Sequence, residues 1–381
     1  MLPVLGRFVL AIGFVFALGA PVRAFDSAAD YAFVMDAETG VVLYEKNADA
    51  PMSPASMSKL MTVLMVFEAL RDGAVQPDTK FFVSDDAWRR GGSASGGSTM
   101  FLNARSKVSV LDLLRGVIVQ SGNDACIALA EGLAGSEEAF ADMMTERGIE
   151  LGLRNSVFAN STGLPDTSHK MSARDLGHLA RIIAQEFSDY YPLFAERAFT
   201  WNGIRQTNRN PLLYADIGAD GLKTGHTKES GYGLVASAEQ GGRRLIIVLN
   251  GMTSKRARAA EARKVMNYGF RSFTSEVLVE SGDVVTELPV WHGRKGNVLL
   301  VPDRLFKVIV PRGGMRRMAA TVTYEKPVLA PIKKGDQLGV LRITLPGLLP
   351  QEMPLVAAED VARGGMISRA FDGLGYLLFG D

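Results

Sequence analysis

Alternating apolar and polar positions at two distant points of the chain predict a single β-sheet. Residues 31–35 and 41–45 are short apolar runs on either side of residues 36–40, an arrangement typical of a hairpin. Three more strand candidates lie far downstream, at residues 221–227, 232–238 and 244–250. We expect these five antiparallel strands, drawn from both ends of one domain, to form one closed sheet.

Between the two groups of strands, apolar residues recur at the three- and four-residue spacing of helices. The helical patterns cover residues 57–71, 111–120 and 124–132, and another follows the last strand at residues 254–268. Ser53 suits an N-cap and Pro54 the first helical position, so Ser56 should fall in the first turn of the first of these helices. Helices packed around a five-stranded antiparallel sheet make this an α+β domain.

The pattern changes near Phe273. From residue 276 to 356 the chain has short alternating segments, such as 307–310 and 320–324, separated by prolines. We expect a small all-β domain there and find no candidate catalytic cluster in it. The predicted organisation is a catalytic domain at residues 25–273, a small β-rich domain at residues 274–363 and a tail at residues 364–381.

The N-terminus resembles a secretory signal. Arg7 precedes an apolar run at residues 8–18, and Val22-Arg23-Ala24 fits a small-x-small cleavage pattern. Residues 1–24 are therefore predicted to be a cleaved signal peptide, which directs the chain out of the cytoplasm. An uncleaved anchor is the alternative, although the run is short for a span of about 20 residues.

The tail predicts an amphipathic helix. Its apolar residues recur at helical spacing: Ile367, Ala370, Phe371, Leu374 and Leu378. The segment is too short and too charged to span a bilayer, but it could lie flat on a membrane surface. A helix packed on its own domain is the alternative.

Composition excludes several function classes. With 42 basic and 41 acidic residues and no basic stripe, nothing favours nucleic acid as a partner. Cys126 is the only cysteine, so no intramolecular disulfide can form, and its apolar neighbours favour a buried residue over a nucleophile. No His, Cys and carboxylate cluster has metal-ligand spacing, so we expect no metal site.

Three short polar motifs, each present once and in this order, carry the candidate chemistry: Ser56-x-x-Lys59, Ser121-x-Asn123 and Lys223-Thr224-Gly225. Ser56 and Lys59 are three residues apart on one helical face, so the lysine amine can approach the serine hydroxyl. A lysine takes a proton from serine only when neutral, and burial beside a second cation such as Lys223 would lower its pKa toward that state.

The other two motifs are predicted to complete a cleft. Ser121 and Asn123 lie in a tight connection between two helical patterns, from which both side chains can point into a cavity. Lys223-Thr224-Gly225 heads a predicted strand, where an extended peptide could pair with the backbone and Gly225 permits close approach. We expect Arg209 to add a cation nearby, with a solvated arginine as the alternative.

These motifs and the residues around them resemble the serine-type D-Ala-D-Ala carboxypeptidases, the low-molecular-weight penicillin-binding proteins of the penicillin-recognising serine peptidases. The similarity runs from about Tyr31 to the C-terminus, and its main stretches are residues 54–62, 114–116, 120–125 and 221–227. The resemblance implies a β-lactamase/transpeptidase-like fold for the first domain and a stalk or placement role for the second. It also implies that Ser121 passes a proton to the leaving amine and that Asn123 orients Lys59 and the substrate amide.

By the same resemblance Ser56 forms an acyl-enzyme and no cofactor is needed. Lys223 and Thr224 would hold the terminal carboxylate, and backbone N–H groups, including that of Ser56, would form the oxyanion hole. The expected activity is removal of the terminal D-alanine from peptidoglycan stem peptides that end in D-Ala-D-Ala, with β-lactam antibiotics as acylating inhibitors. The expected location is the periplasmic face of the bacterial inner membrane, which the tail would contact.

Three alternatives stay open at this point. A class A β-lactamase shares the motifs but adds a Glu-x-x-Leu-Asn loop, which residues 150–155 match only in part. A D,D-endopeptidase would use the same site on a different peptide bond. A non-catalytic peptidoglycan-binding protein would be expected to lose Ser56 or Lys59, and both are present.

Overall fold

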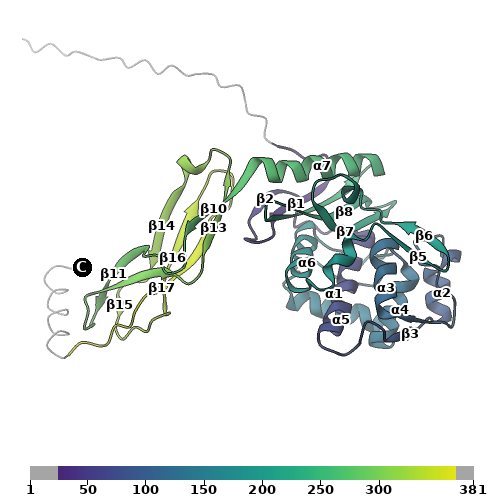
Figure 1. The fold of residues 1–381 in the computed structure, drawn as a ribbon, viewed down its shortest axis with the longest axis horizontal. Helices are drawn as coiled ribbons and strands as arrows, with labels where there is room; N and C mark the ends of the chain where they lie inside the picture. The colour runs from purple at the N-terminus through teal and green to yellow at the C-terminus, as the bar shows by residue number, and fades with distance from the viewer. Residues whose placement is uncertain (1–24, 366–381) are drawn as a thin grey trace, which may run out of the picture.

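The computed structural model describes residues 25–365. The chain forms a larger part of helices around a sheet and a smaller part built of strands, which follow one another where α7 (Lys255–Ser272) runs into β10 (Phe273–Val279) (Figure 1). The predicted signal peptide and the five apolar residues of the predicted tail helix lie outside the described residues. No helix among residues 25–365 is long and apolar enough to cross a bilayer.

The five predicted strands of the catalytic domain pair in one antiparallel sheet, in the order β2-β1-β9-β8-β7. Their bounds are β1 Tyr31–Asp36, β2 Val42–Lys46, β7 Ala219–Thr227, β8 Gly231–Gln240 and β9 Arg243–Met252. The prediction of a closed sheet was wrong. The sheet is open, because β2 and β7 each pair with only one described strand, and β7 therefore presents a free edge.

Side-chain alternation along β1 shows how helices cover both faces of this sheet. Phe33 and Met35 join the larger core with α1 (Lys59–Arg71) and α6 (Ala173–Glu186), whereas Ala32 and Val34 join the core beneath α7. Helix α1 is buried almost all round, as expected of a helix that runs through the middle of a domain. The α+β prediction is confirmed.

The start of α1 differs from its prediction. Ala55 adopts φ +47°, a left-handed conformation that interrupts the helical run expected after Ser53. Residues Ala55–Ser58 form a 3-10 turn, η1, with no side-chain cap, and α1 begins only at Lys59. Ser56 consequently lies in η1 and not in the first turn of α1.

The other helices of the domain surround α1. They are α2 (Asp85–Gly91), α3 (Val110–Arg115), the π-helical turn η3 (Gly116–Gln120), α4 (Asn123–Ala134) and α5 (Glu137–Glu150). Two small hairpins complete it, β3 (Lys80–Phe82) with β4 (Lys107–Ser109), and β5 (Ala198–Trp201) with β6 (Ile204–Thr207). Short 3-10 turns are η2 (Ser93–Ser95), η4 (Tyr191–Ala195) and η5 (Pro211–Tyr214).

The predicted small all-β domain is confirmed. Its main sheet has the order β14-β16-β17-β12-β11-β15, and β10 pairs separately with β13. The bounds are β11 Thr286–Trp291, β12 Asn297–Pro302, β13 Phe306–Pro311, β14 Ala319–Tyr324, β15 Val328–Leu329, β16 Gln337–Thr344 and β17 Gln351–Ala357, with the turn η6 at Met315–Arg317. The domain has its own apolar core, which includes Leu300, Ile343 and Leu355.

Candidate active site

The 3-10 turn η1 brings the first motif together. Side chains three residues apart eclipse one another in a 3-10 turn, so Lys59 at the end of η1 lies in line with Ser56. The Lys59 Nζ is 3.0 Å from the Ser56 Oγ. The predicted contact between amine and hydroxyl is therefore present, although the turn that makes it is tighter than the α-helical turn expected.

The Lys59 amine has three oxygen neighbours and is fully buried. Besides Ser56 Oγ, it donates to Asn123 Oδ1 at 2.7 Å and to the backbone carbonyl of Thr162. Both carbonyl oxygens can only accept hydrogen bonds. A neutral amine has two N–H groups for these two acceptors and one lone pair, which is left facing the Ser56 hydroxyl. The arrangement thus suits Lys59 to receive a proton from Ser56.

Electrostatics favour the neutral form of this amine. Burial lowers the pKa of Lys59 below its ordinary value of 10.5, and the Arg209 cation lowers it further, whereas the carboxylates of Glu137 and Asp124 act in the opposite direction. Burial also lowers the pKa of Lys223 well below its ordinary value, with a further lowering from Lys59. The pKa of Lys59 is thus lowered as predicted, but the causes are burial and Arg209; Lys223, the cation expected to lower it, is not among them.

The second motif lies in the connection between η3 and α4. Ser121 adopts a left-handed φ of +60°, and its N–H donates to the Gly116 carbonyl, which closes the π-helical turn. The Gly122 N–H donates to the same carbonyl at 2.9 Å. The Lys223 Nζ donates to Ser121 Oγ at 2.8 Å. The second and third motifs are therefore in direct contact, and π-helical turns such as η3 are frequent at functional sites.

One cavity of about 630 Å³ unites the predicted site residues. Six of them line it: Ser56, Ser121, Asn123, Arg209, Thr224 and Gly225. Lys59 and Lys223 lie beneath, hydrogen-bonded to lining residues. The cavity lies along residues 224–227 of β7, and no described strand pairs with the outer edge of β7.

The third motif is placed differently from its prediction. It lies within β7, four residues after the strand begins at Ala219, and does not head the strand. At Gly225 an added Cβ would come within 2.8 Å of the Pro54 carbonyl oxygen, so only glycine lets the strand pack against the segment that carries Ser56. The predicted close approach at Gly225 is therefore to the protein's own backbone.

Two contributors were not predicted from the sequence. The Thr162 carbonyl bonds Lys59, and Gly163 next to it packs against η1, where a Cβ would come within 2.1 Å of the Ala55 carbonyl oxygen. Arg258, in the first turns of α7, lines the cavity while only 6% exposed, and its Nη2 donates to the Arg209 carbonyl at 3.3 Å. A backbone acceptor has no side-chain signature in the sequence, whereas the basic start of α7 at Lys255–Arg258 was a signal that could have been noticed.

The loop that contains the 3-10 turn η2 (Ser93–Ser95) lies at the cavity. Gly96, Gly97 and Ser98 line it, and Ser98 Oγ accepts a hydrogen bond of 2.6 Å from Arg209 Nη1. The loop is fixed by α4, because the Asn123 N–H donates to the Ser98 carbonyl at 2.8 Å.

Cys126, which the sequence favours as a buried residue, and His226 can also be placed. Cys126 is fully buried, and burial raises the pKa of its thiol to about 12, which makes it a poor nucleophile. His226 stacks on Tyr232 with ring centroids 3.7 Å apart at the rim of the cavity, and Ser56 contacts Lys59 instead. Among residues 25–365, no group of three or more His, Cys, Asp or Glu residues could hold a metal ion.

Comparison with known proteins agrees with this geometry. Residues 18–253 match the family model described as D-alanyl-D-alanine carboxypeptidase, and residues 273–363 match that of the penicillin-binding protein 5 C-terminal domain. The chain is 40% identical to D-alanyl-D-alanine carboxypeptidase DacC of Escherichia coli over 342 residues, which cover 89% of this chain and 86% of the relative.

Two solved structures extend the comparison. Penicillin-binding protein 5 from Haemophilus influenzae matches 90% of this chain and 100% of its own, with a TM-score of 0.82 and 34% identity. The Streptomyces K15 DD-transpeptidase covers 65% of this chain and 98% of its own, with a TM-score of 0.60 and 30% identity. Fold, motif order and sequence thus agree, and the chain belongs to the D-alanyl-D-alanine carboxypeptidase family.

Proposed function

We propose that this protein removes the terminal D-alanine from peptidoglycan stem peptides through an acyl-enzyme on Ser56. The observation that carries the proposal is the buried Lys59 amine, which touches the Ser56 hydroxyl at the base of a cavity bordered by a free strand edge. Family membership gives the substrate class, because the relatives are D-alanyl-D-alanine carboxypeptidases.

Acylation begins with the neutral Lys59 as general base. It takes the proton of Ser56 Oγ as this oxygen attacks the carbonyl carbon between the two D-alanines. Asn123 and the Thr162 carbonyl hold the amine in line with the hydroxyl. The Ser56 N–H, together with an N–H from the free edge of β7, would stabilise the oxyanion of the tetrahedral intermediate.

The leaving D-alanine needs a proton on its amine. Ser121 is placed to pass one, because its hydroxyl accepts a hydrogen bond from Lys223 and faces the cavity. The Asn123 side chain also lines the cavity and can orient the substrate amide. Peptide cleavage would then leave an ester on Ser56, which water hydrolyses.

Positive charge at one end of the cavity would hold the terminal carboxylate. Thr224 and Arg209 line this region, Lys223 lies below it, and Arg258 adds a second guanidinium. Arg258 Nε is buried and has no hydrogen-bond partner among residues 25–365, so a ligand carboxylate could improve the environment of this cation. The extended substrate would pair with β7 as an added strand, with Gly225 keeping that strand close to Ser56.

The alternatives receive no support from the comparisons. A class A β-lactamase uses a glutamate to activate the deacylating water, and within residues 25–365 no carboxylate hydrogen-bonds to Ser56 or Lys59. The intact Ser56–Lys59 contact argues against a non-catalytic binding protein. An endopeptidase would differ in the peptide accepted beyond the terminal D-alanine position, and the assay below includes that substrate.

Export and membrane contact are part of the same proposal. Residues 1–24 would act as the signal peptide, residues 25–273 as the catalytic domain and residues 274–363 as a domain that places it relative to the cell wall. The apolar residues of the tail at residues 364–381 would then attach the enzyme to the periplasmic face of the inner membrane. Support comes from the sequence patterns at both ends and from the cell-wall substrate of the family.

The central test is product analysis with the purified protein. A pentapeptide ending in D-Ala-D-Ala should release free D-alanine, and penicillin should leave one penicilloyl adduct on Ser56, because the lactam carbonyl mimics the scissile amide. Mass mapping of peptides locates the adduct. If the protein only splits crosslinked muropeptides and releases no D-alanine, it is an endopeptidase and not a carboxypeptidase. A penicilloyl adduct on another residue, or no adduct, would contradict the acyl-enzyme mechanism on Ser56.

Substitution of Lys59 and of Lys223 should reduce activity in different ways. Lys59→Ala removes the base and should slow acylation by every substrate by about 100-fold or more. Lys223→Ala should slow substrates with a free carboxylate about tenfold more than matched uncharged esters. A bound carboxylate favours the charged form of the Lys223 amine and opposes the lowering of its pKa by burial, so the variant loses a charge-assisted contact that an ester does not make. The control Lys307→Ala, in β13, should leave both rates unchanged. Equal losses on both substrate kinds in the two variants would contradict this division of roles.

The tail prediction concerns location and not chemistry. Burying its apolar residues at about 25 cal/mol per Å² would give on the order of several kcal/mol of bilayer affinity, before the cost of ordering the helix. A chain ending at Arg363 should keep full activity on soluble peptides yet stay in the aqueous fraction, while the full chain sediments with membranes through a high-salt wash. Release of the full chain by salt alone would indicate electrostatic attachment. Equal sedimentation of both chains would mean that a segment other than the tail anchors the protein.

A further inference from the structure

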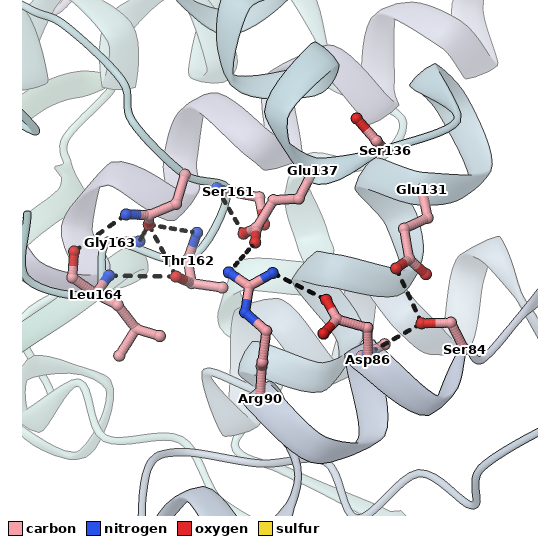
Figure 2. A network of polar contacts seen from close by, with 12 residues as sticks. Ser84, Asp86, Arg90, Glu131, Ser136, Glu137, Ser161, Thr162, Gly163 and Leu164 are labelled. Carbon is pink, nitrogen blue, oxygen red and sulfur yellow. Dashed lines mark hydrogen bonds and ion pairs between the residues drawn. The ribbon is translucent and has the colours of Figure 1, made fainter.

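Glu137 is a buried carboxylate next to the active site that the steps above do not use. It is the first residue of α5 and only 5% exposed. Its Oε1 accepts hydrogen bonds from the Ser161 N–H at 3.0 Å and the Ser161 hydroxyl at 2.7 Å, and its Oε2 accepts one from Arg90 Nη2 at 2.6 Å (Figure 2). Both carboxylate oxygens are therefore engaged, one by a loop and one by a cation.

The loop held by Glu137 is the one that holds Lys59. Ser161 is followed by Thr162, whose carbonyl accepts a hydrogen bond from the Lys59 amine. From the other side, Thr62 of α1 donates its hydroxyl proton to the Ser161 carbonyl at 2.7 Å. Glu137 thus fixes Ser161, the residue next to Thr162, whose carbonyl orients the proposed base.

Arg90 is the cation that pairs with the Glu137 carboxylate. Its guanidinium lies between Glu137 and Asp86, and its Nη1 donates to Asp86 Oδ2 at 2.9 Å (Figure 2). A neutral glutamine could accept the two Ser161 hydrogen bonds without the cost of burying a charge. The presence of a carboxylate with a dedicated cation points to an electrostatic role in addition to a geometric one.

We propose that Glu137 is a positioning residue for Lys59, acting through Ser161 and Thr162, and that its ion pair with Arg90 sets how much negative charge Lys59 experiences. This inference rests on the proposed function of Lys59 as the base for Ser56. Glu137 does not act as the base itself, because its oxygens bond Ser161 and Arg90 and contact neither Ser56 nor Lys59.

The charge of Glu137 has a predictable sign of effect. It raises the pKa of Lys59 against the larger lowering by burial, and Asp124 of α4 acts in the same direction. The other titratable groups near Lys59 are Lys223 of β7, Arg209, Cys126 of α4 and His169. The charge of Glu137 also raises the pKa of Cys126, whose burial already keeps its thiol neutral, so a change at Glu137 or Arg90 acts on Lys59 without creating a new charge beside it.

The test compares four variants of the full chain by the rate of acylation with a fluorescent penicillin as a function of pH. Glu137→Ala removes the support of Ser161 and should slow acylation about 10- to 100-fold at every pH, by misplacing the Thr162 carbonyl. Glu137→Gln keeps an acceptor for Ser161 but removes the charge. It should approach the wild-type plateau rate, with the acid limb of the profile moved to lower pH because the pKa of Lys59 falls.

Arg90→Gln should move the acid limb in the opposite direction. It leaves the charge of Glu137 uncompensated, so the pKa of Lys59 rises and a higher pH is needed to form the neutral base. The matched control is Glu68→Gln, which breaks the 2.7 Å ion pair between Glu68 and Arg147. That pair joins α5 to α1, whereas the Glu137–Arg90 pair joins α5 to α2, and it makes no hydrogen bond to Ser161 or Thr162. The profile of Glu68→Gln should therefore coincide with that of the wild type.

Opposite shifts in Glu137→Gln and Arg90→Gln are the signature of the proposal, since a purely structural role would change the plateau and leave the limb in place. Shifts in the same direction, or unmoved limbs in both, would overturn it. If Glu137→Ala fails to fold, the two glutamine variants still decide. If the wild type itself is not acylated on Ser56, the proposed function has failed and not this inference alone.

Discussion

The buried amine of Lys59 is the interaction on which the rest of the site depends. An amine removed from water in this way is stabilised only if its N–H groups find acceptors, and two carbonyl oxygens, from Asn123 and Thr162, provide them. In the neutral amine, the lone pair is then left for Ser56 Oγ, 3.0 Å away. Moving any of these three neighbours would leave either an unsatisfied N–H or a lone pair directed away from the hydroxyl.

The fold supplies these neighbours from four separate elements. The 3-10 turn η1 aligns Ser56 with Lys59, the π-helical turn η3 leads into the connection with Ser121 and Asn123, and β7 places Lys223 against Ser121. The loop with Thr162 closes the fourth side and is itself fixed by Glu137. Two of these elements are irregular helical turns, and an open sheet leaves β7 free to bind a peptide.

The sequence predicts those parts of the site that depend on the identity of side chains. Three ordered motifs identify the residues around the cavity, and apolar periodicity predicts the five strands and most of the helices. The 3-10 turn was missed because Ser53 and Pro54 also suit an α-helical start, and it is the left-handed conformation of Ala55 that prevents one. Thr162 was missed because its contribution is a backbone carbonyl, 103 residues away from Lys59. Glu137 and Arg90 are ordinary helix residues in sequence, and only their contacts across the fold distinguish them.

The central claim, that Lys59 is poised as a neutral base, can be measured on the amine itself. Lysine side chains would be isotopically labelled, the Nζ signals titrated by NMR, and the signals of Lys59 and Lys223 assigned from Lys59→Arg and Lys223→Arg variants. The account predicts that Lys59 loses its proton at a pH clearly below the ordinary lysine pKa of 10.5. A Lys59 signal that titrates together with the exposed lysines would contradict it, because Ser56 would then face a permanently charged amine.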